Sequence, residues 1–285
     1  MGELHDRAPG IRAVKWHVDW IRRPVVGIAL IVIVLGALFN GAVYVAGLMG
    51  FMAVAASREW HRMIGKGRYV PEALVTAVTV VVALGLLLWW PNPKMAWIAL
   101  VGGMGVALIV SGLRNTHAIW QGAGVLYLGV PSLAIVSLYM FAAQPAWVLI
   151  GFLISVWATD TGALVAGNLI GGPKLAPVLS PNKTWAGTLG GIAAAALVQV
   201  IFIASLRGGW LFAAALYGAG LAVVAIAGDL FESWVKRRFQ VKDSGSLIPG
   251  HGGILDRVDS TLAAGVVAAV VVLVLEFDPL FGVRV

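Results

Sequence analysis

Apolar residues run along the chain in stretches close to twenty residues long, separated by short polar segments. An α-helix needs about 20 apolar residues to cross a bilayer, whereas a membrane β-barrel shows short alternating segments. The predicted helices are residues 24–39, 42–56, 72–90, 96–113, 123–141, 146–167, 184–205, 210–238 and 259–275. The first two are short, so we expect a tight hairpin or partly buried helices there rather than two full crossings. We therefore expect an all-α polytopic membrane bundle of about nine transmembrane helices.

The distribution of basic residues predicts the orientation of this bundle. If the N-terminus is cytoplasmic, 17 of the 20 Lys and Arg residues fall inside, and only Lys94, Arg207 and Arg284 fall outside. Cytoplasmic loops of membrane proteins carry such an excess of positive charge. The net charge of +7 is thus explained by topology and anionic lipid headgroups rather than by nucleic acid.

The chain divides into three parts on this map. Residues 1–23 form a cytoplasmic segment, either an interfacial helix or a solvated tail, and we expect no removable signal peptide there. Residues 24–145 hold the N-terminal transmembrane helices, and residues 146–285 hold a C-terminal transmembrane region whose candidate active site, built from the residues described below, is expected on the cytoplasmic side. Cysteine is absent, which excludes disulfides, thiolate zinc sites and cysteine nucleophiles.

Acidic residues gather near the predicted cytoplasmic ends of three helices. Asp160 lies in the helix 146–167, Asp229 in the helix 210–238, and Asp256 and Asp259 at the start of the last helix. A charge at membrane depth is costly, so these acids indicate function. Carboxylates without His or Cys partners suit Mg²⁺, which takes one or two of them together with substrate phosphates. The ion relay of a transporter would look similar at this level.

Glycines and basic residues accompany these acids in the stretch 228–260, "GDLFESWVKRRFQVKDSGSLIPGHGGILDRVDS". The spacing of Asp229, Glu232, Ser233 and Lys236 places them on one helix face, where Glu232 and Lys236 also suit an ordinary ion pair. The glycines around His251 let a backbone approach a phosphate, although they also suit a flexible turn. Together, these acids, glycines and basic residues predict a polyphosphate substrate with a metal ion at the inner face of the membrane. The position of the site there predicts a lipid as the second reactant.

The segment "SWVKRRFQVKDSGSLIPGHGGILDRVDS" resembles the bacterial phosphatidate cytidylyltransferases, also called CDP-diacylglycerol synthases. Their pattern reads S-x-x-K-R, K-D, P-G-H-G-G and D-R-x-D. It is met by Ser233, Lys236, Arg237, Lys242, Asp243, His251, Gly252, Gly253, Asp256, Arg257 and Asp259. The segments "GDLFES" and "DTGA…GN…SPNKTWAG" extend the resemblance over the C-terminal half. The chain departs from the family at Asn168, where Arg is common, and at Ala186, where an acid is common.

The resemblance implies a nucleotidyltransferase of phospholipid biosynthesis in the bacterial inner membrane, with CTP and phosphatidic acid as substrates and CDP-diacylglycerol as product. It also implies a homodimer, and Mg²⁺, with a second cation as an option, held by Asp229 and Asp256. Catalytic roles are expected for Asp229, Asp256, Lys236, Lys242, Asp243, His251 and Arg257. Substrate binding is expected for Lys183, Ser180, Arg237, Ser233, Gly252, Gly253, Asp259 and Asp160. The alternatives are a CTP-dependent polyprenol or lipid kinase and an ion-coupled transporter.

Overall fold

The computed structural model describes residues 10–66, 71–90, 92–206, 209–245 and 252–276. These residues form nine α-helices: α1 (Gly10–Asn40), α2 (Ala42–Ile64), α3 (Glu72–Trp89), α4 (Pro93–Leu113), α5 (Ala118–Phe141), α6 (Pro145–Ile170), α7 (Trp185–Ser205), α8 (Leu211–Arg238) and α9 (Leu255–Ala269). A π-helical turn (Val270–Val274) continues α9. Within the described ranges, seven helical segments are long and apolar enough to cross a membrane. The expected all-α membrane bundle is therefore confirmed.

The number and ends of the helical spans differ in part from those predicted from the sequence. The seven candidate spans are the helices α3 to α8 and the segment Leu255–Val274, while α1 contributes a shorter apolar stretch, Val25–Asn40. Helix α2 is not among these seven candidate spans, so the count of nine crossings is not confirmed within the described residues. Helix α1 is continuous from Gly10, so no break marks the predicted boundary at residue 23. Helix α9 starts four residues before its predicted start at 259.

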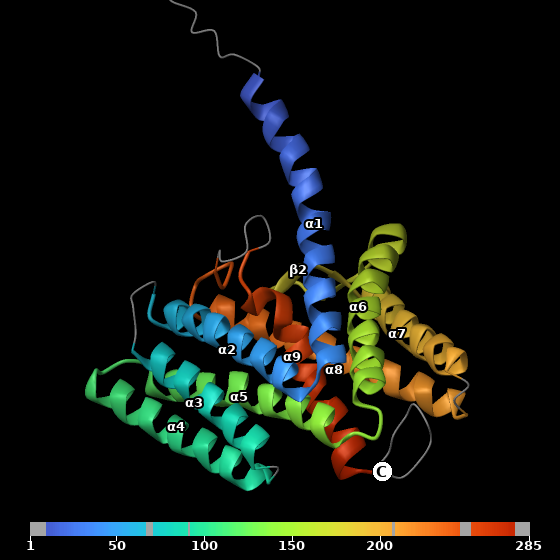
Figure 1. Ribbon diagram of the computed structural model, residues 1–285. Helices are drawn as coiled ribbons and strands as arrows, with labels where there is room; N and C mark the ends of the chain where they lie inside the picture. The colour runs from blue at the N-terminus through green and yellow to red at the C-terminus, as the bar shows by residue number, and fades with distance from the viewer. Residues whose placement is uncertain (1–9, 67–70, 91, 207–208, 246–251, 277–285) are drawn as a thin grey trace, which may run out of the picture.

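The helices form two groups that α9 joins (Figure 1). Helices α2 to α5 pack against one another in the first group, and α6 to α8 pack together in the second. Helix α9 contacts α8 and α6 on one side and α5 and α2 on the other. The start of α9 therefore lies where the two groups meet, and both groups can place side chains next to it.

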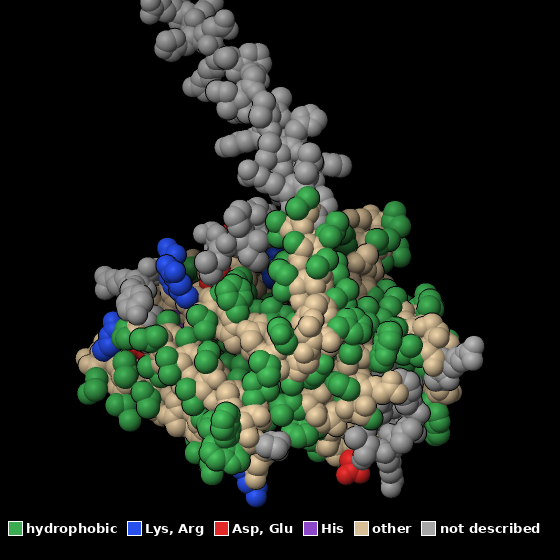
Figure 2. All heavy atoms as spheres, in the orientation of Figure 1, with side chains coloured by type: hydrophobic (Ala, Val, Ile, Leu, Met, Phe, Trp, Pro, Cys, Tyr) green, Lys and Arg blue, Asp and Glu red, His purple; other side chains and the backbone are tan. Residues whose placement is uncertain are grey.

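Apolar side chains cover the outside of the helices. Ile98 of α4, Leu189 of α7 and Leu216 of α8 are each about 60% exposed. Figure 2 shows apolar side chains spread over one face of the molecule, with few charged ones among them. Soluble proteins rarely expose so much contiguous apolar surface, whereas the lipid-facing surface of a membrane protein is apolar. The chain is therefore an integral membrane protein.

A short hairpin joins α6 to α7, over residues that, apart from Thr184, the apolar pattern assigns to no helix. Strand β1 (Lys174–Ala176) pairs with β2 (Ser180–Thr184) in antiparallel register. Strand β2 runs directly into α7, whose first turn is capped by Thr184, because its Oγ1 accepts a hydrogen bond from the Gly187 amide at 3.1 Å. Lys183 precedes this cap by one residue, so the hairpin and the helix together fix its backbone.

Glycines bring α6 and α7 into close contact. A Cβ atom on Gly191 would lie 2.7 Å from the backbone carbonyl oxygen of Thr159, and one on Gly187 would lie 2.8 Å from that of Ala163. Small residues of this kind let membrane helices approach closely. The contact matters for function because Thr159 precedes Asp160 on α6.

Replacing Gly191 with Val is expected to destabilise this helix pair. The added side chain must displace the α6 backbone, which costs roughly 1–3 kcal/mol of unfolding free energy. The measurement is the thermal unfolding midpoint in detergent micelles. Gly220→Val is the matched control, since a Cβ at Gly220 meets no atom within 4 Å. Equal midpoints for the two variants would contradict the close contact.

Candidate active site

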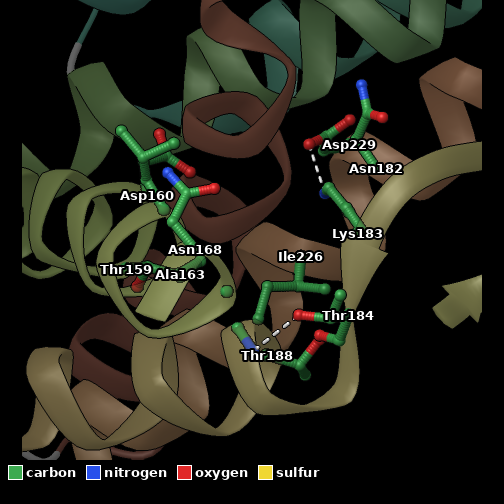
Figure 3. Close-up of a pocket in the computed structure, with 13 residues that line it drawn as sticks. Thr159, Asp160, Ala163, Asn168, Asn182, Lys183, Thr184, Thr188, Ile226 and Asp229 are labelled. Atoms are coloured by element: carbon green, nitrogen blue, oxygen red, sulfur yellow. Dashed lines mark hydrogen bonds and ion pairs between the residues drawn. The ribbon is translucent and has the colours of Figure 1, made fainter. Parts of the chain in front are cut away.

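An ion pair between Lys183 and Asp229 lies at the centre of the candidate site. Lys183 comes from β2 and Asp229 from α8, and their side chains are 28% and 30% exposed. Both line a cavity of about 260 Å³ that is bounded by α6, β2, α7 and α8, and Figure 3 shows them pointing toward one another there. Asp160 and Asn168 of α6 line the same cavity, together with the apolar side chains of Leu164 and Ile226.

A second cavity, of about 290 Å³, borders the start of β2, whereas the first cavity borders the end of that strand. The second cavity is lined by Leu179, Ser180, Pro181, Asn182, Ser233, Lys236, Arg237, Lys242 and Asp243. Three of these side chains are cations, and Asn182 also lines the first cavity. The predicted site residues of the hairpin thus meet those of α8 and the following loop. Such cations suit phosphate oxygens, for which charge-assisted hydrogen bonds are strong.

Lys236 connects α8 to α9. Its Nζ donates hydrogen bonds to Oε2 of Glu232 at 3.0 Å and to Oδ1 of Asp256 at 2.9 Å. The first contact is the intrahelical ion pair that the spacing allowed, and the second joins two helices that the sequence could not pair. Because Lys236 also lines the second cavity, one ammonium group links the carboxylates to the cationic pocket.

Asp256 is held by backbone amides as well as by Lys236. The amide of Ser244 lies 3.3 Å from Oδ1 and 3.2 Å from Oδ2, and the Gly253 amide donates to Oδ2 at 3.1 Å. The carboxylate therefore ties the loop after α8 to the first turn of α9. Its side chain keeps 14% exposure and lines neither of the two cavities.

Glu232 and Asp259 are two acids that are more deeply buried than Asp256. Their relative exposures are 0% and 6%, and the two carboxyl groups interact with each other. Asp259 accepts a hydrogen bond from the Ser260 amide at 2.7 Å. Oε1 of Glu232 is buried and has no hydrogen-bond partner among the described residues. Asp259 lines neither cavity, so its predicted contact with substrate stays a prediction.

The donor set fits Mg²⁺ held together with substrate phosphates. Within the described ranges, no group of three or more His, Cys, Asp or Glu side chains is arranged to enclose a metal ion. Mg²⁺ does not need such a group, since it usually keeps waters and binds one or two carboxylates plus phosphate oxygens. Asp229 and Asp256 are hard oxygen donors with partial exposure, and each is now balanced by a lysine.

The remaining predicted residues are spread around this centre. Arg257 is exposed and close enough to Asp160 for an electrostatic interaction. Gly252 has a positive φ of 82°, and a Cβ there would lie 3.5 Å from Oδ2 of Asp256. His251 lies outside the described residues, so its role stays a prediction, as do the individual catalytic and binding roles of the others. Ala186, one of the two departures from the family pattern, is half-buried in the first turn of α7.

Sequence reasoning missed Glu59 of α2, which contacts the start of α9. The Leu255 amide donates to its Oε2 at 2.8 Å and the Ile254 amide to its Oε1 at 3.1 Å. Its one signal in the sequence is an acid among the basic residues of "SREWHRM", directly after an apolar run. That signal is weak because surface acids are common in such segments.

The chain is similar in sequence to one protein family and to named members of it. The model of the cytidylyltransferase family matches residues 21–275. A phosphatidate cytidylyltransferase of Brucella suis biovar 1 is 45% identical over 169 residues, which is 58% of this chain and 60% of that protein's length. The phosphatidate cytidylyltransferase of Rickettsia bellii is 32% identical over 199 residues, covering 66% of this chain and 84% of the relative. The phosphatidate cytidylyltransferase of Staphylococcus saprophyticus is 35% identical over 194 residues, covering 64% of this chain and 74% of the relative.

Proposed function

Because this chain belongs to the cytidylyltransferase family, we propose that it transfers a cytidylyl group from CTP to phosphatidic acid, giving CDP-diacylglycerol and pyrophosphate. The observation that carries the proposal is the pair of neighbouring cavities that Asn182 of β2 lines in common, with the Lys183–Asp229 ion pair in the first of them. One cavity is rich in cations, as a triphosphate requires. The other combines charged groups with apolar residues of the membrane helices, as a lipid phosphate requires.

The nucleotide is proposed to occupy the cation-rich cavity. Arg237 and Lys242 line it, and Lys236 reaches it from the same helix as Arg237. These side chains would bind the β- and γ-phosphates and orient the α-phosphorus toward β2. Holding the phosphates in place favours an in-line displacement, because positioning and charge neutralisation supply most of the catalysis in such transfers.

Phosphatidic acid is proposed to enter the other cavity from the lipid phase. Its phosphate monoester, with a second pKa near 6, is already ionised enough at pH 7 to act as the nucleophile. An oxygen of that phosphate forms the new bond to the α-phosphorus, and the bond from the α-phosphorus to the pyrophosphate oxygen breaks. Lys183 would hold the attacking phosphate, so neither a serine nucleophile nor a dedicated base is needed.

The metal site is proposed to lie at Asp229 and Asp256. Bound Mg²⁺ would neutralise charge on the phosphate oxygens as pyrophosphate leaves. Lys183 and Lys236, which now balance these two acids, would turn their ammonium groups toward substrate oxygens when the ion is present. Asp160, Asp243 and Asp259 are proposed as outer partners, and a second cation remains an option.

The proposal also includes a location and an assembly. We place the protein in the bacterial inner membrane with the site facing the cytoplasm, on the strength of the 17 basic residues on the predicted inner side. CTP is a cytoplasmic nucleotide, so this orientation agrees with the proposed substrate. Homodimerisation is proposed from the family resemblance alone.

Two labels distinguish the proposed activity from that of a CTP-dependent lipid kinase. The purified protein is incubated with Mg²⁺, phosphatidic acid or a polyprenol, and CTP labelled at either the α- or the γ-phosphate. The proposal expects labelled lipid only from α-labelled CTP and only with phosphatidic acid. Lipid labelled from γ-labelled CTP would instead identify a kinase and overturn the proposal.

A further inference from the structure

The carboxylate of Glu59 reaches from α2 into the connection between α8 and α9. Glu59 is 3% exposed, and its bonding partners lie 185 to 196 residues further along the chain. Beyond the two amides of Ile254 and Leu255, the Ser244 hydroxyl donates to its Oε2 at 3.3 Å. Both carboxylate oxygens are thus satisfied by the loop that carries the candidate site.

Glycines in this loop make room for the carboxylate. A Cβ atom on Gly253 would lie 2.7 Å from Oε2 of Glu59, and one on Gly245 would overlap Oε1. From the sequence, Gly252 and Gly253 were expected to let the backbone approach a substrate phosphate. In the structure the amides of Gly253, Ile254 and Leu255 already donate to carboxylates of the protein itself.

The part of α2 that carries Glu59 is firmly held. Trp60 is 1% exposed, stacks on Tyr127 at a centroid distance of 4.7 Å, and donates from Nε1 to the Trp120 carbonyl at 3.0 Å. His61 is hydrogen-bonded to Gln121 and, at 2.7 Å, to Thr76. Helices α3 and α5 therefore fix the end of α2, so that Glu59 approaches α9 from a rigid base.

Glu59 and Asp256 hold the same turn from two sides. The Ser244 amide donates to Asp256, while the Ser244 hydroxyl donates to Glu59. The two bonds to Ile254 and Leu255 end directly before Asp256 on α9. A negative charge at a helix N-terminus is favourable, so Glu59 takes the place that a bound anion would occupy there.

We propose that Glu59 is a positioning residue for the transfer reaction, which fixes the N-terminus of α9 and thereby orients Asp256 toward metal and phosphate. This inference rests on the proposed function and deepens it. It also implies that the substrate phosphates bind through Arg237 and Lys242 rather than through the N-terminal amides of α9. A helix of the N-terminal group thus takes part in building the site of the C-terminal region.

Glu59→Gln tests the proposal with a nearly isosteric side chain. The NH2 group of the new Gln side chain faces one of the backbone N–H groups of α9 and cannot accept its hydrogen bond, and the remaining acceptor is uncharged. The first turn of α9 is then held less firmly, and kcat is expected to fall about tenfold or more. The Mg²⁺ concentration for half-maximal rate should rise, because Asp256 is less well oriented. Glu59→Asp keeps the charge on a shorter arm and should restore part of kcat.

Glu72→Gln is the matched control for loss of a buried carboxylate. Glu72 is 0% exposed and accepts hydrogen bonds from Ser111 and Arg114, both at 3.0 Å, between α3 and α4. The variant Glu72→Gln should lower the thermal unfolding midpoint of the protein without changing the Mg²⁺ concentration that the transfer requires. If Glu59→Gln kept the wild-type kcat and Mg²⁺ requirement, or merely repeated the effects of Glu72→Gln, the proposal would be overturned.

Hydrogen exchange supplies a readout that does not depend on activity. In Glu59→Gln the amides of Ser244 and Leu255 should exchange faster than in the wild type, and in Glu72→Gln they should not. If the wild type showed no cytidylyl transfer but Glu59→Gln still showed this faster exchange, the proposed function would be contradicted, whereas the role of Glu59 in fixing the N-terminus of α9 would not. If Glu59→Gln does not fold well enough to be purified, Ser244→Ala is the second variant, because it removes one hydrogen bond to Glu59. If Ser244→Ala left both the exchange rate of the Leu255 amide and the Mg²⁺ requirement of the transfer unchanged, the proposal would be overturned.

Discussion

Asn in place of Asp229 is expected to lower the rate of cytidylyl transfer by about 100-fold or more, the usual cost of removing a group that stabilises transition-state charge. Asp229 pairs with Lys183 and lines the cavity proposed for phosphatidic acid. The substitution keeps the side-chain shape but removes the charge proposed to bind Mg²⁺. The measurement is the initial rate of CDP-diacylglycerol formation by purified protein at saturating CTP.

A second acid provides the control for this substitution. Glu276 follows the π-helical turn after α9, at the opposite end of that helix from Asp256. Glu276→Gln makes the same change from acid to amide away from the cavities and should keep the wild-type rate. A rate for Asp229→Asn that equals that of Glu276→Gln would remove Asp229 from the catalytic machinery.

Lys236→Met is expected to lower both stability and activity. Its Nζ is bonded to Glu232, whose side chain is 1% exposed, and to Asp256, so its loss leaves buried negative charge without a partner. Breaking a buried ion pair in this way typically costs about 3–5 kcal/mol. The thermal midpoint in detergent should therefore fall strongly, while Lys94→Met, at the exposed start of α4, should leave it unchanged.

A double variant separates the two roles of Lys236. In Lys236→Met with Glu232→Gln the more deeply buried of the two carboxylates is neutral, so much of the lost stability should return. The rate of transfer should stay at least about tenfold below the wild type, because the cation that faces the phosphates is still missing. Recovery of the rate together with the stability would show that Lys236 acts on the fold alone.

The sequence was sufficient to predict the helices, because membrane spans leave long apolar runs. It was not sufficient to predict their exact ends or the hairpin. Nothing in the apolar pattern distinguishes a short β-hairpin from an irregular loop, so the hairpin was not predicted, and Thr184 was assigned to the following helix. The first turn of α9 was placed too late because Leu255, Asp256 and Arg257 look like the end of a polar loop.

The candidate site was predictable as a set of residues but not as an arrangement. The spacing of Glu232 and Lys236 predicted their contact, since both lie on one helix face. The contacts of Lys183 with Asp229 and of Lys236 with Asp256 depend on how separate helices pack, which spacing along one helix does not encode. Glu59 was missed for the same reason, because its partners lie nearly 200 residues away.

The most direct test of the account is the stoichiometry of products formed by the purified wild-type protein in vesicles that contain phosphatidic acid. With Mg²⁺ and α-labelled CTP, we expect CDP-diacylglycerol and pyrophosphate to appear in equal amounts, and neither to appear when phosphatidic acid or CTP is left out. Release of orthophosphate or CDP with no labelled CDP-diacylglycerol would contradict it.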